Sequence, residues 1–186
     1  MIGFAMCGSY CTHAASLRQL EGLVEKGFEV QPILSENVYV TDTRFGKAEE
    51  LIERVTEICG HPPIHTVVGA EPLGPQIPLD ALLICPCTGN TLAKIAMGIT
   101  DTSVTMAAKA HLRSDRPLVI ALASNDALSA NLKNIGLLLS RKCVFFVPMR
   151  QDDPEKKPHS LIADFNLLEP TLRSAKEGKQ YQKIFL

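Results

Sequence analysis

The sequence contains no tryptophan and few aromatic residues, and it has no excess of charge of either sign. Its 19 Lys and Arg balance 20 Asp and Glu, for a formal net charge of −1. Nucleic acids and anionic membrane surfaces attract proteins with excess positive charge, so we expect neither partner. The apolar runs, such as residues 117–123, are also far shorter than the roughly 20 residues of a membrane-spanning helix.

Targeting and metal-binding signals are missing as well. The N-terminus has no basic region of the kind that begins a secretory signal peptide, so we expect the protein to remain in the cytoplasm. The six cysteines include no C-x2-C pair and no histidine at zinc-finger spacing, which argues against a metal site. In a reducing compartment, most of them are expected to be small buried hydrophobic residues.

What the sequence does contain is a regular alternation of short apolar runs and longer segments with helical spacing. Strands are predicted over residues 2–6, 28–34, 81–85, 117–123 and, as the last, 143–147. Helices are predicted over residues 12–26, 47–59, 92–97, 102–112 and 129–141. Such alternation is typical of parallel strands joined by right-handed crossovers. We therefore predict an α/β protein with a Rossmann-like, three-layer, doubly wound parallel sheet.

The chain is expected to form a single domain. Residues 1–148 make up a nucleotide-binding domain, and residues 149–186 add a charged loop, a short helix from about 160 to 173 and a polar tail that packs on it.

Ligands of doubly wound sheets bind at the carboxyl ends of the strands. The first strand is followed by Gly8 and Ser9, in a turn whose N–H and hydroxyl groups could hold a phosphate. The G-x-G-x-x-G motif is absent, which favours a mononucleotide over a dinucleotide. The other interpretation is that Gly8 only permits a tight turn.

Polar residues also follow the second and third strands. Ser35 ends the second strand, and Thr88, Asn90 and Thr91 follow the third, with Gly89 allowing a close approach of the backbone. These side chains could bind a planar polar ligand. They could also cap the next helix, and the two interpretations are compatible.

Several of these segments resemble known families. Residues 86–94, PCTGNTLAK, resemble the P-x-S-x-N-T-x-x-K stretch of the flavoprotein superfamily that includes FMN-dependent cysteine decarboxylases, and residues 100–119 are similar to flavin prenyltransferases. A closer resemblance, to the family of dipicolinate synthase B subunits, covers nearly the whole chain. It is carried by residues 70–75, 87–91, 124–128, 133–138 and 151–154.

The resemblance implies the flavoprotein fold, with strand order 3-2-1-4-5-6, and an oxidoreductase-type subunit. It implies that the chain works with the dehydrogenase-like A subunit of dipicolinate synthase in the oxidative formation of dipicolinate from a dihydro- or tetrahydrodipicolinate precursor. The setting would be the mother cell of a sporulating bacterium. FMN is the implied cofactor, with NADPH as the alternative, and relatives suggest a homo-oligomer, a trimer or a multiple of it.

Matching positions imply a set of site residues. The implied cofactor-binding residues are Gly8, Ser9, Ser35, Thr88, Gly89, Asn90, Thr91 and Arg116. Asn125 matches the asparagine of the decarboxylases' P-x-M-N motif. A dicarboxylate needs a basic partner, for which Arg116 and Lys94 are the candidates.

The catalytic residue stays unassigned. At the position where the decarboxylases carry an active-site histidine this chain has Pro72, and around Asn125 the rest of P-x-M-N is replaced. Glu71 and His13 are the remaining candidates for proton transfer. These departures keep two alternatives open: a non-catalytic scaffold or regulatory subunit, and an FMN-dependent decarboxylase with a different substrate.

Overall fold

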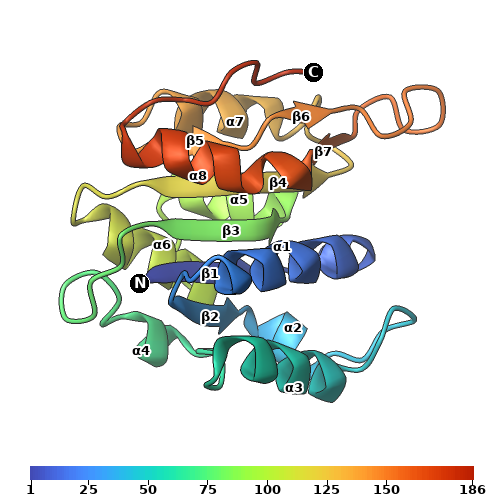
Figure 1. Cartoon of the computed structure of the whole chain (residues 1–186). Coiled ribbons are helices and arrows are strands. Elements are labelled where there is room, and N and C mark those ends of the chain that lie inside the picture. The colour runs from blue at the N-terminus through green and yellow to red at the C-terminus, as the bar shows by residue number, and fades with distance from the viewer.

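The computed structural model describes all residues, 1–186, and contains one sheet covered by helices on both faces (Figure 1). Five parallel strands form its main part, in the order β2-β1-β3-β4-β5. They are β1 (Ile2–Met6), β2 (Val30–Leu34), β3 (Leu82–Cys87), β4 (Leu118–Ser124) and β5 (Val144–Phe146). Their residues are almost all buried, as expected for a parallel sheet between two helical layers. The predicted fold class is confirmed.

Helices form the two outer layers. They are α1 (His13–Glu25), α2 (Glu36–Val40), α3 (Ala48–Cys59), α4 (Val67–Ala70), α5 (Gly89–Met97), α6 (Ser103–Leu112), α7 (Leu132–Leu139) and α8 (Leu168–Lys176). One apolar cluster packs α1, α3 and α8 against one face of the sheet. A second cluster packs α4, α5, α6 and α7 against the other face. Figure 1 shows α1 and α8 in front of the sheet and α5 behind it. No helix is long and apolar enough to cross a lipid bilayer.

The implied strand order 3-2-1-4-5-6 needs a correction at its third strand. Beyond β2 there is only a single parallel bridge, between Ile33 and Ile64. The Ile64 N–H donates to the Pro32 carbonyl at 3.0 Å, and the Ile64 carbonyl accepts from Leu34 N–H at 2.8 Å. The two residues before Ile64 are prolines, which have no N–H to donate, so no longer ladder forms. Counted along the chain, the parallel order is therefore 2-1-3-4-5.

The C-terminal segment differs from the prediction in two respects. Residues 143–147 are not the last strand, because β6 (Met149–Arg150) and β7 (Leu161–Ala163) follow, and the helix predicted from residue 160 begins only at Leu168. β7 pairs antiparallel with β4 through Ala123 and Ser124. The reason is that β4 is longer than β5: its last residues have unpaired backbone groups, and β7 supplies their partners.

Candidate functional site

The carboxyl ends of β1, β3 and β4 surround a cavity of about 470 Å³, which we call the edge cavity. Its volume lies within the usual range for small-molecule sites. Its walls come from residues 8–12, 44–45, 88–90, 123–126 and 160–162, with Asp152 and Lys157. The structure therefore brings together Gly8, Ser9, Thr88, Gly89, Asn90 and Asn125 from the predicted set.

The turn after β1 has free donors. The backbone N–H groups of Gly8, Tyr10 and Cys11 make no hydrogen bond within the chain, and the Ser9 hydroxyl does not cap the helical turn that follows. The Thr12 hydroxyl donates to the Ser9 carbonyl at 2.8 Å and holds the turn in shape. Several unpaired N–H groups converging on one place form a binding site for an anionic group, so this turn suits a phosphate.

Thr88 is the N-cap of α5, as the structural interpretation predicted. Its Oγ1 accepts from Thr91 N–H at 3.2 Å and donates to Thr91 Oγ1 at 3.0 Å. Thr91 is thereby occupied, and it is buried and does not line the edge cavity. Asn90 is exposed on the first turn of α5, lines the cavity and makes no hydrogen bond, so its amide is free for a ligand.

A partly buried polar network at the end of β4 was missed by the sequence reasoning. The Asp126 carboxylate accepts from Ser124 Oγ at 2.5 Å and from Asn131 Nδ2 at 2.9 and 3.0 Å. Asn134 Nδ2 in turn donates to Asn131 Oδ1 at 2.8 Å. The hydrogen bonds from Ser124 and Asn131 lower the pKa of Asp126, which stays ionised. The signal was available for Ser124 and Asp126, since both follow a predicted strand.

This network explains Gly89 differently from the prediction. A Cβ at position 89 would lie closer than 3.0 Å to Ser124 Oγ, Asn131 Nδ2 and Asp126 Oδ1. Gly89 is therefore required because the network packs against its backbone. Close approach of a ligand is not needed to explain it.

Two cations lie at the rim of the edge cavity. Lys157 donates to Asp152 Oδ2 at 2.8 Å, and this bond lowers the pKa of the Asp152 carboxyl. Arg44 lies with its guanidinium carbon 4.9 Å from the centre of the Phe45 ring. Because both side chains come from loops that border the cavity, they can attract an anionic ligand to it.

Three of the predicted site residues lie elsewhere. Arg116 precedes β4, at the opposite edge of the sheet, and its Nη1 donates to the Leu79 carbonyl at 2.8 Å. Arg116 therefore does not line the edge cavity, because parallel strands all begin at the same edge and Arg116 lies before one of them. Lys94 Nζ lies 2.9 Å from both carboxylate oxygens of Asp101 and does not line the cavity. The Ser35 N–H donates to the Met6 carbonyl at 3.1 Å. Ser35 therefore lies at the carboxyl end of the strands, as predicted, but it does not line the edge cavity.

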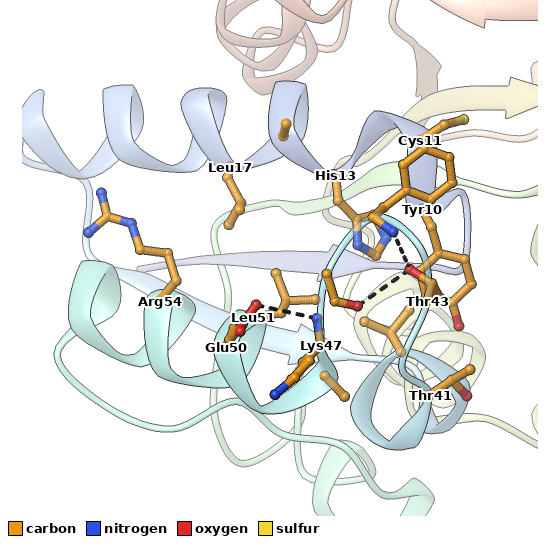
Figure 2. Close-up of a pocket in the computed structure, with 15 residues that line it drawn as sticks. Tyr10, Cys11, His13, Leu17, Thr41, Thr43, Lys47, Glu50, Leu51 and Arg54 are labelled. Carbon is orange, nitrogen blue, oxygen red and sulfur yellow. Dashed lines mark hydrogen bonds between the residues drawn. The ribbon is translucent and has the colours of Figure 1, made fainter.

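Neither candidate for proton transfer lines the edge cavity. Glu71 is exposed at the C-terminal end of α4. His13 is buried at the start of α1, and its Nε2 lies 2.8 Å from the Cys7 carbonyl. Burial lowers the pKa of His13. This histidine lines a second cavity (Figure 2), which shares Tyr10 and Phe45 with the first.

The strand-end cysteines are buried, as predicted. Burial raises the pKa of Cys7 to about 11 and that of Cys85 to about 12, so both thiols stay protonated. Cys85 Sγ donates to Ser16 Oγ at 3.5 Å. No three His, Cys, Asp or Glu side chains are grouped closely enough to hold a metal ion.

Comparison with known proteins gives a consistent result. The Flavoprotein family model matches residues 1–164. The dipicolinate synthase B subunit of Bacillus subtilis (strain 168) is 45% identical over 185 residues, covering 100% of this chain and 92% of the relative. The crystal structure of the dipicolinate synthase B subunit from Bacillus halodurans C superposes with a TM-score of 0.91 at 42% identity, covering 100% and 95% of the two chains. The FMN-dependent cysteine decarboxylase SpaF shares the fold, with a TM-score of 0.65 at 23% identity over 94% and 95% of the chains.

Proposed function

Because the chain belongs to the flavoprotein family, we propose that it binds a flavin in the form of FMN at the edge cavity. The observation that carries this proposal is the turn after β1, where three unpaired N–H groups and the Ser9 hydroxyl are available to the FMN phosphate. The free amide of Asn90 would bind the polar edge of the flavin ring. No step of this assignment depends on Arg116.

We further propose that the chain acts as the B subunit of a dipicolinate synthase, as its full-length similarity to such subunits suggests. With a dehydrogenase-like A subunit, it would contribute to oxidising a dihydro- or tetrahydrodipicolinate precursor to pyridine-2,6-dicarboxylate in the mother cell of a sporulating bacterium. Bound FMN supplies a reversible acceptor for two electrons. Arg44 and Lys157 would attract the two carboxylates of the precursor.

The residues of the edge cavity also support a second candidate, a subunit that binds ligand but performs no chemistry of its own. Asp126 is one of the ionisable residues that line it, and its carboxylate already accepts hydrogen bonds from Ser124 and Asn131. The low pKa of Asp126 makes it a weak base. In this alternative the partner subunit carries out the proton transfers.

Flavin uptake and product formation separate these candidates. The purified protein is mixed with FMN, and retained flavin is read from its visible absorbance. We expect Asn90→Ala to weaken FMN binding by about tenfold, the loss of roughly one hydrogen bond. Asn166→Ala, an exposed asparagine away from the cavity, is the matched control and should bind as the parent does.

Product formation is then followed with the dehydrogenase-like partner present. Flavin uptake together with faster formation of pyridine-2,6-dicarboxylate supports the catalytic subunit. Faster formation without any flavin uptake supports the non-catalytic subunit. If the protein neither takes up flavin nor changes the rate of product formation, the proposed function is wrong.

A further inference from the structure

A second cavity of about 270 Å³ lies between α1, α3 and the loop of residues 41–47 (Figure 2), and we call it the α1–α3 cavity. Leu17, Val38 and Leu51 give it an apolar wall, to which Tyr10 and Phe45 add aromatic rings. Tyr10 and Phe45 also line the edge cavity, so the two cavities are neighbours that share part of one wall. The volume suits a ligand of one or two rings.

The one buried polar side chain of this cavity is His13, which is 9% exposed. Its Nε2 lies 2.8 Å from the Cys7 carbonyl, which can only accept, so Nε2 carries the hydrogen. Nδ1 of the neutral ring therefore has a free lone pair, and it makes no hydrogen bond within the chain. Nδ1 of His13 is also not fully enclosed by the protein. The only fully buried side-chain nitrogen or oxygen atom without a hydrogen-bond partner is Nδ1 of His111. His13 therefore contributes to the wall of this cavity an imidazole whose acceptor no group of the chain occupies.

The charged groups around the cavity do not occupy this acceptor. Arg54 is paired with Glu21 at 2.5 Å and with Glu57 at 3.1 Å. The Glu50 carboxylate accepts from the backbone N–H of Lys47 at 3.4 Å, at the start of α3. The Lys47 ammonium makes no ion pair. The cavity thus offers one buried acceptor and one free cation at its rim.

We propose that the α1–α3 cavity binds a small planar heterocycle that carries an N–H donor, with the N–H donating to Nδ1 of His13. The ring packs against the apolar wall and beside Tyr10 and Phe45. A carboxylate at this position would place its lone pairs against the lone pair of the imidazole, whereas a donor satisfies it. The donor contact is separate from the flavin proposal, because His13 is not among the residues assigned to FMN.

The test compares two probes that differ only in the donor. 2-Pyridone is a planar ring with an N–H beside its carbonyl, and N-methyl-2-pyridone has the same ring without the N–H. Their binding to the full-length protein is measured by NMR titration, with the histidine rings labelled with ¹⁵N. We expect 2-pyridone to shift the Nδ1 signal of His13 and to bind at least tenfold more tightly than its N-methyl derivative.

Two variants examine the site. His13→Phe keeps an aromatic ring beside Tyr10 but removes the acceptor, and it should bind the two probes equally. Ala14→Phe fills the cavity from the exposed side of α1 without changing the bond to Cys7, and it should bind neither probe. His159→Phe, at an exposed position outside this cavity, is the control and should bind as the parent does.

The result that overturns the inference is equal affinity of the parent protein for both probes, or 2-pyridone binding that survives in Ala14→Phe. Displacement of 2-pyridone by FMN would also overturn it, since the probe would then occupy the edge cavity. Failure of FMN uptake with 2-pyridone binding intact would reject only the proposed flavin site.

Discussion

Gly89 shows how one residue can have a sequence context that favours one explanation and a structural environment that requires another. It lies in a polar turn after a strand, where ligands commonly bind. Its backbone nevertheless contacts the network of Ser124, Asp126 and Asn131, whose polar atoms fill the space of a Cβ. Because Gly89 has no side chain, this network can pack directly against its backbone beside the edge cavity.

Gly89→Ala should lower the free energy of unfolding by about 1–3 kcal/mol, because the added methyl group displaces this network. Gly22→Ala is the control: in α1 an added Cβ meets nothing within 4 Å, and alanine should stabilise the helix by about 0.5–1 kcal/mol. Urea denaturation measures both changes. Equal urea midpoints for Gly89→Ala and the parent would show that the network rearranges without a loss of stability.

His111 makes stability depend on pH. It is fully buried, its Nε2 lies 3.0 Å from the Pro117 carbonyl, and burial lowers its pKa, as it also does for His13. Below about pH 6.5 the unfolded chain takes up protons that the folded chain does not, so stability is present above that pH and is lost as the pH falls.

The free energy of unfolding should therefore decrease between pH 7.5 and 5.5, by up to about 1.4 kcal/mol per unit for each buried histidine below its unfolded pKa. His111→Gln should reduce this slope, whereas His159→Gln, an exposed position, should leave it unchanged. Urea midpoints across the pH range provide the measurement. A slope that persists in both the His111 and His13 variants would assign it to other groups.

At the scale of elements, α5 and α6 both begin with a threonine N-cap, but only one of the two caps lies at the edge cavity. Thr88 caps α5 at the edge cavity, and Thr102 caps α6 in a capping box with Thr105, where the Thr102 side chain accepts from Thr105 N–H at 3.2 Å. Thr102 does not line the edge cavity. The pair therefore separates the structural role of a cap from its place in a binding site.

Thr88→Ala and Thr102→Ala should each lower the free energy of unfolding by about 1 kcal/mol through the loss of an N-cap. Only Thr88→Ala should also weaken FMN uptake, because α5 presents Asn90 to the edge cavity. Chemical denaturation and retained flavin absorbance measure the two effects. An equal loss of flavin in both variants would mean that uptake follows stability alone.

At the scale of the whole molecule, the C-terminal tail covers the edge of β5 that has no neighbouring strand. Gln180 Oε1 accepts from the buried Phe146 N–H at 2.8 Å, and Gln180 Nε2 donates to the Phe146 carbonyl at 2.6 Å. One side chain thus takes the place of a neighbouring strand. β7 does the same for the end of β4 with its backbone.

Gln180→Ala should lower the free energy of unfolding by about 1–3 kcal/mol, because it leaves both backbone groups of Phe146 without partners in a buried strand. Gln182→Ala, exposed in the same tail and without such contacts, is the control. Thermal unfolding compares the two variants. A Gln180→Ala protein as stable as the control would show that water replaces the lost bonds.

The sequence by itself determined the alternation of strands and helices, the sheet type, the turn at Gly8 and Ser9 and the cap at Thr88. These features depend on the period of apolar residues and on turn chemistry, which act between near neighbours in the chain. The limit to a single bridge at Ile64 is also local, because the two prolines before it have no N–H to donate.

Only the tertiary structure decided which strand ends share a cavity and that His13 lines a second one. β6 and β7 are too short to show a period of their own, and they pair where a longer β4 leaves backbone groups free. Gly89 meets Asn131 only because the crossover from β3 to β4 brings their segments together. Such contacts depend on how distant segments pack, and no local pattern records them.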